Sequence, residues 1–122
     1  MRNKEQVDGL IDQLWKNGYM TLSRKYGKYL PAPPLMGKYE VDAVAKYKRK
    51  IAVGITVSDE ELNNHSFLGK LEFLSNYPHH SFGNKITLFI GVQNDSLAKA
   101  SLLISSLDEE TQKHIKLICI SA

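Results

Sequence analysis

The sequence predicts an α/β domain in which a central mixed β-sheet of about five strands is flanked by helices on both faces. Two apolar runs, residues 51–57 (IAVGITV) and 85–92 (KITLFIGV), have the composition of central strands that are covered on both sides. A helix-like segment follows each run and leads to another strand, which is the order expected of parallel neighbours. At 122 residues, of which 43% are apolar, the chain is predicted to form one domain, 1–122, around one core.

Residues 4–17 are predicted to form the first helix, because their apolar residues recur at the spacing of one buried helical stripe. Gly18 is placed to end this helix in a left-handed conformation. β-Forming residues predict a first strand at 19–23. The following loop, 24–37 (RKYGKYLPAPPLMG), contains three prolines, which lack a backbone donor, and it is predicted to be exposed. The stripe consists of Val7, Leu10, Ile11, Leu14 and Trp15.

Residues 39–46 (YEVDAVAK) alternate along their length and predict a second strand, with Asp42 in its interior. The alternation places Tyr39, Val41, Ala43 and Ala45 on one side. A charged turn, YKRK, then leads into the buried strand at 51–57.

The second half of the chain is predicted to alternate helices and strands. Ser58 is a hydroxyl cap followed by three acidic residues, which predicts one helix from 58 to 74. A further helix is expected from 95 or 96 to 104, and a last strand at 116–120. The only cysteine, Cys119, lies in that apolar strand and is expected to be a buried thiol.

Charge is distributed unevenly along the chain. Residues 1–50 carry eleven Lys or Arg and five acidic residues, 11 − 5 = +6, whereas the whole chain carries +3, so the remainder sums to 3 − 6 = −3. A basic half predicts one face that is attracted to phosphates, although lysines that are merely solvated would give the same count. No apolar stretch approaches the roughly 20 residues that span a bilayer, so a cytoplasmic protein without a membrane segment is expected.

Several segments occur together in a recurrent order. Glu5 lies early in the first helix, LWKNGY (14–19) spans that helix's end, EVDAVA (40–45) forms the first strand of a hairpin, and FLGKLEFL (67–74) lies in the later helix. Over residues 4–92 this order and spacing resembles the restriction-endonuclease-like (PD-(D/E)xK) nuclease superfamily. Within it, the chain is most similar to the small archaeal Holliday-junction resolvases.

The resemblance implies a nuclease fold, DNA as the partner, a possible homodimer and a metal site. In the superfamily, an Asp on the first hairpin strand and an acid-x-Lys triplet on the second hold Mg²⁺ against the scissile phosphate and position the attacking water. Asp42 matches the metal-binding Asp, and Glu5 is a candidate for the first-helix Glu. Mg²⁺ is therefore the cofactor expected of an active enzyme, and no cofactor is expected otherwise.

The triplet departs from this pattern. Counted from the start of the second strand, it falls at Gly54-Ile55-Thr56, which supplies neither a carboxylate nor an ammonium. Gly54 either permits a close approach or marks a lost side chain, and the second interpretation is favoured. The candidate for a catalytic lysine is then Lys70, on the following helix. Lys46 and Lys50 could also approach from the turn. The acids on that helix are Glu60, Glu61 and Glu72, although capping and ordinary surface charge would also explain them.

Two basic segments are candidates for nucleic-acid binding. One lies in the proline loop, where Tyr26 and Tyr29 alternate with cations in a pattern that suits phosphate contact and base stacking. The alternative is that these tyrosines pack on the edge of the sheet while the cations stay in water. The candidate cations are Arg24, Lys25 and Lys28 in the loop and Lys48, Arg49 and Lys50 in the hairpin turn.

Three hypotheses follow. The first is a nuclease-fold protein with a degenerate metal site, which binds nucleic acid or a protein partner without standard cleavage. The second is an active Mg²⁺-dependent DNA endonuclease with a migrated acid and lysine. The third is a non-catalytic interaction or dimerisation module that uses the apolar residues of the proline loop, namely Leu30, Leu35 and Met36.

Overall fold

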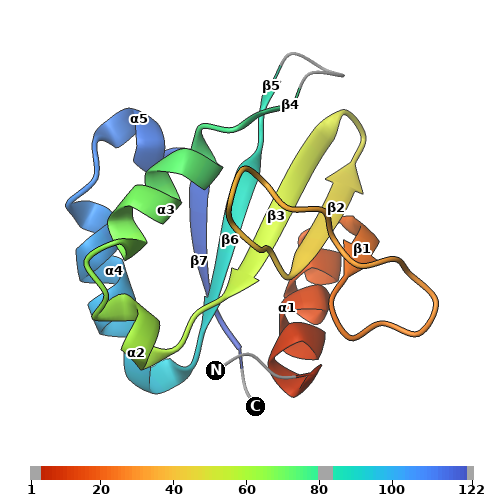
Figure 1. Cartoon of the computed structure of the whole chain (residues 1–122), viewed down its shortest axis with the longest axis horizontal. Helices are drawn as coiled ribbons and strands as arrows, with labels where there is room; N and C mark the ends of the chain where they lie inside the picture. Colours follow the sequence, from red (N-terminus) through yellow and green to blue (C-terminus); the bar gives the residue numbers. More distant parts are fainter. Residues whose placement is uncertain (1–3, 80–83, 121–122) are drawn as a thin grey trace.

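The computed structural model describes residues 4–79 and 84–120, and Arg2, which contributes to the basic half, lies outside them. Their main feature is a five-stranded sheet with the order β1-β2-β3-β6-β7 (Figure 1). β4 and β5 form a second, two-stranded sheet, and β5 leads directly into β6. The elements are α1 (Lys4–Lys16), β1 (Met20–Arg24), β2 (Ala43–Tyr47), β3 (Lys50–Thr56), α2 (Asp59–Leu62), α3 (Phe67–Ser75), β4 (Pro78–His79), β5 (Asn84–Lys85), β6 (Thr87–Val92), η1 (Asn94–Ser96), α4 (Leu97–Ser105), α5 (Glu109–Gln112) and β7 (Ile115–Cys119).

The sheet is mixed, as the sequence predicts. β1, β2 and β3 pair in antiparallel fashion, whereas β3 pairs with β6 and β6 with β7 in parallel. The parallel strands are reached across helices, α2 and α3 in the first connection and α4 and α5 in the second. Each parallel connection needs such a crossover, which explains why the helices interrupt the second half of the chain.

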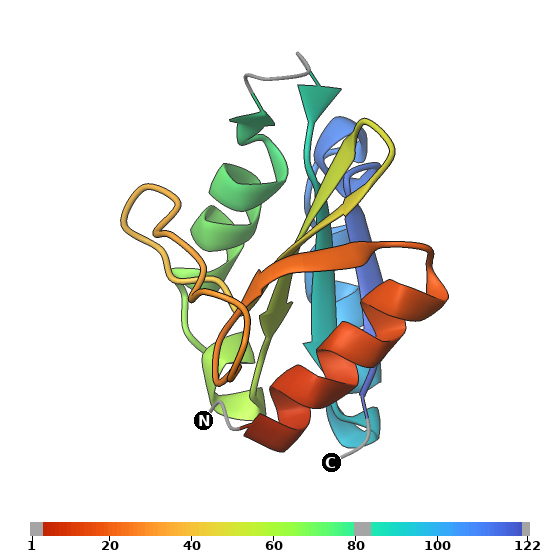
Figure 2. The same ribbon diagram turned by 90° about the vertical axis from the view of Figure 1, so that its right-hand side faces the viewer.

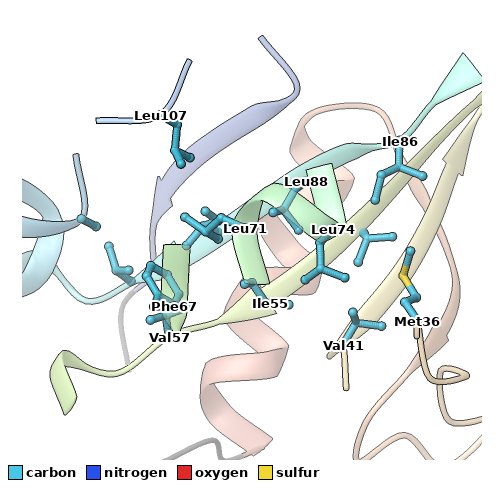
Figure 3. Packing of buried hydrophobic residues seen from close by; sticks show 14 of the residues in the cluster. Met36, Val41, Ile55, Val57, Phe67, Leu71, Leu74, Ile86, Leu88 and Leu107 are labelled. Carbon is cyan, nitrogen blue, oxygen red and sulfur yellow. The ribbon is translucent and has the colours of Figure 1, made fainter. Parts of the chain in front are cut away.

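Helices cover both faces of the sheet, and two apolar layers result (Figure 2). On one face Leu10 and Leu14 of α1 pack with Ala43, Ala52 and Phe89. The other layer is larger and is shown in Figure 3, where side chains of α3 meet the alternate residues of β3 and β6. Its largest fully buried members are Val41, Val53, Ile55, Leu71, Leu74, Ile86, Leu88 and Ile90.

The second strand is shorter than the alternation predicts. β2 begins at Ala43, so Asp42 precedes the strand instead of lying inside it. The chain turns at this point: Val41 packs in the α3 layer, whereas Ala43 and Ala45 pack against α1. The prediction that these residues share one side was therefore wrong, because the pleat is interrupted at Asp42.

The helix predicted from 58 to 74 is divided into α2 and α3. Ser58 caps α2 as expected and forms a capping box with Glu61. The chain then leaves the helix, and Asn64 Oδ1 accepts hydrogen bonds from the backbone N and the Oγ of Ser66, at 3.0 and 2.8 Å. Short polar side chains that bond nearby backbone in this way compete with a continuous helix.

Three predictions of burial were wrong. Trp15 is 69% exposed, because it lies about 100° around α1 from the buried Leu14, outside the stripe that faces the sheet. Cys119 is exposed at the end of β7, an edge strand with a half-buried pattern. Met36 is buried in the α3 layer, although its loop was expected to be exposed. No helix within the described residues is long and apolar enough to cross a membrane.

Candidate nucleic-acid interface

Asp42, the residue that matches the metal-binding Asp, is completely buried. Its Oδ2 accepts hydrogen bonds from the backbone N of Thr56 at 2.6 Å and from Thr56 Oγ1 at 3.0 Å. Thr56 is the last residue of the degenerate triplet. The carboxylate is thus held from within this triplet.

Gly54, the first residue of the triplet, is in close contact with α1. A Cβ built on Gly54 would lie 2.8 Å from Leu10 Cδ2 and 3.0 Å from Cδ1, and Leu10 is completely buried. Gly54 therefore permits a close approach, the interpretation that the sequence analysis did not favour. A carboxylate at position 54 has no room while Leu10 keeps its place.

The other two candidates for catalysis lie on opposite faces of the sheet. Glu5 is exposed on α1, and Lys70 is on α3, in the layer that covers the other face. Lys70 Nζ lies 3.9 Å from Glu61 Oε2, and Glu61 also takes part in the capping box of α2. The structure thus brings Lys70 to Glu61, and Glu5 and Lys70 belong to helices that cover opposite faces of the sheet.

These residues do not fit a magnesium ion. Mg²⁺ in proteins usually keeps several waters and takes one or two carboxylates, so it needs room for water beside the carboxylate. Asp42 is completely buried, and its Oδ2 accepts hydrogen bonds from the backbone N and the Oγ1 of Thr56. Within residues 4–79 and 84–120, no three His, Cys, Asp or Glu side chains are grouped so that they could hold a metal.

Arg24 and Lys25 of the proline loop are engaged in ion pairs. Arg24 Nη2 donates to Asp8 Oδ1 at 2.5 Å, and Lys4 Nζ donates to Asp8 Oδ2 at 3.1 Å. The Arg24 hydrogen bond lowers the pKa of Asp8 below its ordinary 3.8, and Lys4 adds to this effect. Lys25 Nζ donates to Glu40 Oε1 at 2.5 Å. Both cations therefore have part of their charge balanced inside the protein.

The hairpin turn presents its cations differently. Lys48, Arg49 and Lys50 are all exposed at the tip between β2 and β3, which we call the hairpin tip. Within the described part of the chain none of the three forms an ion pair. Lys48 Nζ lies 5.3 Å from the centre of the Tyr47 ring, and this tyrosine is 40% exposed. The tip is thus an uncompensated positive surface with an aromatic ring beside it.

The tyrosines of the proline loop line a surface cavity instead of packing on the sheet edge. This edge pocket has a volume of about 320 Å³ and lies between α1, β1 and residues 26–30. Tyr26 is 49% exposed and Tyr29 is 95% exposed. Two residues of α1 in this pocket were not predicted, because only the fold brings α1 beside the loop. Its lining residues are Lys4, Ile11, Thr21, Arg24, Tyr26, Gly27, Lys28, Tyr29 and Leu30.

The two basic segments lie at opposite ends of the β1–β2 ladder. Arg24 pairs with Ala43 at one end, and Met20 pairs with Lys46 at the other, next to the hairpin tip. Figures 1 and 2 show the tip and the loop after β1 well apart in both views. The predicted cations thus form two separate surfaces at the β1–β2 edge of the sheet.

Comparisons of the chain with protein-family models, with curated proteins and with solved structures give no significant match.

Proposed function

We propose that this chain is a nucleic-acid-binding domain of restriction-endonuclease-like fold in which the metal site has become a packing contact. The observation that carries this proposal is the pair of Asp42 and Thr56. The residue that resembles the metal-binding Asp is buried and accepts two hydrogen bonds from the position of the missing lysine. The family resemblance supplies the class of partner, DNA, and the cytoplasm is the expected place of action.

The hairpin tip supports nucleic acid as the partner. Phosphate contacts by Lys and Arg provide most of the affinity of non-specific nucleic-acid binding, and cations already paired with carboxylates contribute less to it. Lys48, Arg49 and Lys50 have no such partner among the described residues, unlike Arg24 and Lys25. We therefore assign the main phosphate contacts to the tip.

The two alternative functions have less support. An active Mg²⁺-dependent endonuclease needs a second carboxylate beside Asp42. The space that a side chain at position 54 would need is occupied by Leu10. An interaction module that uses Leu30, Leu35 and Met36 loses one of its three residues, because Met36 lies in the core. A homodimer is compatible with the proposed function.

The test uses fluorescently labelled DNA as a four-way junction, a single strand and a blunt duplex, each with and without Mg²⁺ or Mn²⁺. Fluorescence anisotropy measures binding, and denaturing gels measure cleavage. We expect salt-sensitive binding and intact DNA. Metal-dependent cleavage that disappears in Asp42→Asn would overturn the proposal, because this variant keeps an oxygen acceptor for Thr56. The absence of binding to all three DNAs would overturn it as well.

A matched pair of variants locates the contact. Replacing Lys48, Arg49 and Lys50 together by Gln removes three charges from the tip. Replacing Lys99, Lys113 and Lys116 by Gln removes three charges from α4, the end of α5 and β7, at the other edge of the sheet. We expect the first variant alone to lose at least tenfold in affinity at 0.1 M salt. Equal losses in both variants would mean that only net charge matters and that the tip is no specific surface.

A further inference from the structure

The edge pocket combines two exposed aromatic rings with an excess of positive charge. Lys4, Arg24 and Lys28 line it, and no acidic residue does. Asp8 balances one charge of the pair Lys4 and Arg24, so the local sum is 3 − 1 = +2. A pocket of this kind fits a ligand that carries both a planar ring and an anionic group.

The tyrosines are presented by a loop that is fixed in place. Tyr26 has a φ of +62°, in the left-handed region that aromatic residues rarely occupy. The loop is closed by a hydrogen bond from Arg24 N to the Pro31 carbonyl at 3.0 Å, and it is tied to the sheet by Lys25 N, which donates to the Asp42 carbonyl at 2.9 Å. Such strain persists only where the surroundings impose it, and it is found most often at binding sites.

The exposure of Tyr29 also points to a ligand. At 95% exposed, this ring contributes almost nothing to the core of the protein. Ile11 of α1 and Leu30 of the loop are apolar residues of the same pocket. The lining therefore combines apolar side chains with two exposed aromatic residues.

We infer that the edge pocket binds one unpaired nucleotide of a nucleic-acid strand, with the base against Tyr26 or Tyr29 and the phosphate at Lys28. A base inside a duplex is stacked on both faces, so only an unpaired base can stack on a tyrosine. The volume of about 320 Å³ lies at the lower end of the range for small-ligand pockets, about 300–1,000 Å³, and suits one nucleotide. This inference rests on the proposed function and names the form of nucleic acid that the protein selects.

Binding measurements test the inference with a single strand, as DNA and as RNA, and with a blunt duplex of the same sequence. Stacking of a base on an aromatic residue contributes enough that its removal costs roughly 5- to 100-fold in affinity. We expect Tyr29→Ala to lose about tenfold on the single strand and little on the duplex. Tyr29→Phe should bind like the wild type, because stacking does not need the hydroxyl. Trp15→Ala, which removes a ring that is 69% exposed on α1 and does not line the pocket, is the matched control.

Photocrosslinking gives a second, site-specific measurement. A single strand with one 5-iodouracil crosslinks to an aromatic side chain in contact with the base, and mass spectrometry of tryptic peptides identifies that side chain. We expect crosslinks at Tyr29 or Tyr26. Crosslinks confined to Tyr47 or Trp15 would overturn the inference, as would equal affinity of Tyr29→Ala and wild type for the single strand. If the wild-type protein binds neither the single strand nor the duplex, the proposed function itself is refuted.

Discussion

Leu10 of α1 occupies the space beside Gly54 in which any side chain at position 54 would begin. The absence of a side chain at position 54 and the close packing of the first helix are thus two sides of one contact. α1 can lie close to the sheet because Gly54 has no Cβ.

The contact predicts that Gly54→Ala destabilises the protein. The added Cβ would meet Leu10 at 2.8 Å, and overpacking of a well-filled core costs about 1–3 kcal/mol. Urea unfolding followed by circular dichroism measures the change. The double variant Gly54→Ala/Leu10→Val should recover part of the loss, because the shorter side chain vacates the space. A double variant whose loss equals the sum of the two single losses would contradict the assigned contact.

Thr56→Val is predicted to destabilise the protein while leaving its shape almost unchanged. The substitution removes the Oγ1 donor to Asp42 but keeps the backbone N–H donor, and a hydrogen bond to a charged group contributes about 1.5–3 kcal/mol. Thr56→Ser keeps the hydroxyl and serves as the control in the same unfolding measurement. Equal destabilisation by Thr56→Ser and Thr56→Val would contradict the role assigned to the hydroxyl.

The ion pair between Asp8 and Arg24 predicts a pH-dependent contribution to stability. The pKa of Asp8 is lowered in the folded protein, so its contribution is fully present above about pH 3.8 and is lost as the pH falls through the lowered pKa. Asp8→Asn should therefore be less stable than the wild type at pH 7, by less than about 1 kcal/mol because the carboxylate is partly exposed. The two proteins should converge in acid.

The control for Asp8→Asn is Asp12→Asn, which removes an exposed pair with Lys16 in the same helix. Unfolding in urea at pH 7, 4 and 2.5 compares both variants with the wild type. A stability difference for Asp8→Asn that persists undiminished at the lowest pH would show that the charge of Asp8 is not its source.

The hairpin tip predicts a change in the salt dependence of DNA binding. Each phosphate contact contributes about 0.7–0.9 to the slope of log K against log salt. Replacing Lys48, Arg49 and Lys50 by Gln should therefore reduce the slope by up to about 2–3, as measured by anisotropy between 50 and 200 mM salt. Tyr29→Ala should weaken binding without changing the slope. An unchanged slope in the triple variant would place the phosphate contacts elsewhere.

Much of the fold follows from local sequence patterns. The apolar runs give β3 and β6 almost to their ends, and Gly18 adopts a φ of +90° where the helix stops. These features are encoded in neighbouring residues, which is why a single sequence suffices. The five-stranded mixed sheet then follows from the order of strands and helices.

What could not be predicted depends on contacts between distant segments. Asp42 looks like part of an alternating strand, yet its side chain turns to Thr56, fourteen residues later. Met36 is buried because the loop returns beneath α3, where the Cβ of an alanine at Gly37 would lie 2.5 Å from the Phe73 ring. Neither relationship leaves a periodic signal in the sequence.

The candidate site shows the same division. The alternation of cations and tyrosines after β1 made Tyr26, Lys28 and Tyr29 candidates from the sequence, and the fold places all three in the lining of one pocket. The ion pairs of Arg24 and Lys25 were not foreseeable, because Asp8 and Glu40 reach them only in the folded chain. The pattern thus indicated the surface, and the fold decided which of its charges remain available.

The hairpin tip and the basic loop that follows β1 lie at opposite ends of the β1–β2 ladder, which sets the distance that a strand reaching both must cover. β2 contains five residues, which at about 3.3 Å each corresponds to roughly 16 Å. Successive phosphates along a base-stacked strand rise about 3.4 Å, so about five stacked nucleotides cover that distance. Oligonucleotides shorter than this can occupy one surface but not bridge the two, and affinity should therefore increase with length in a step rather than gradually.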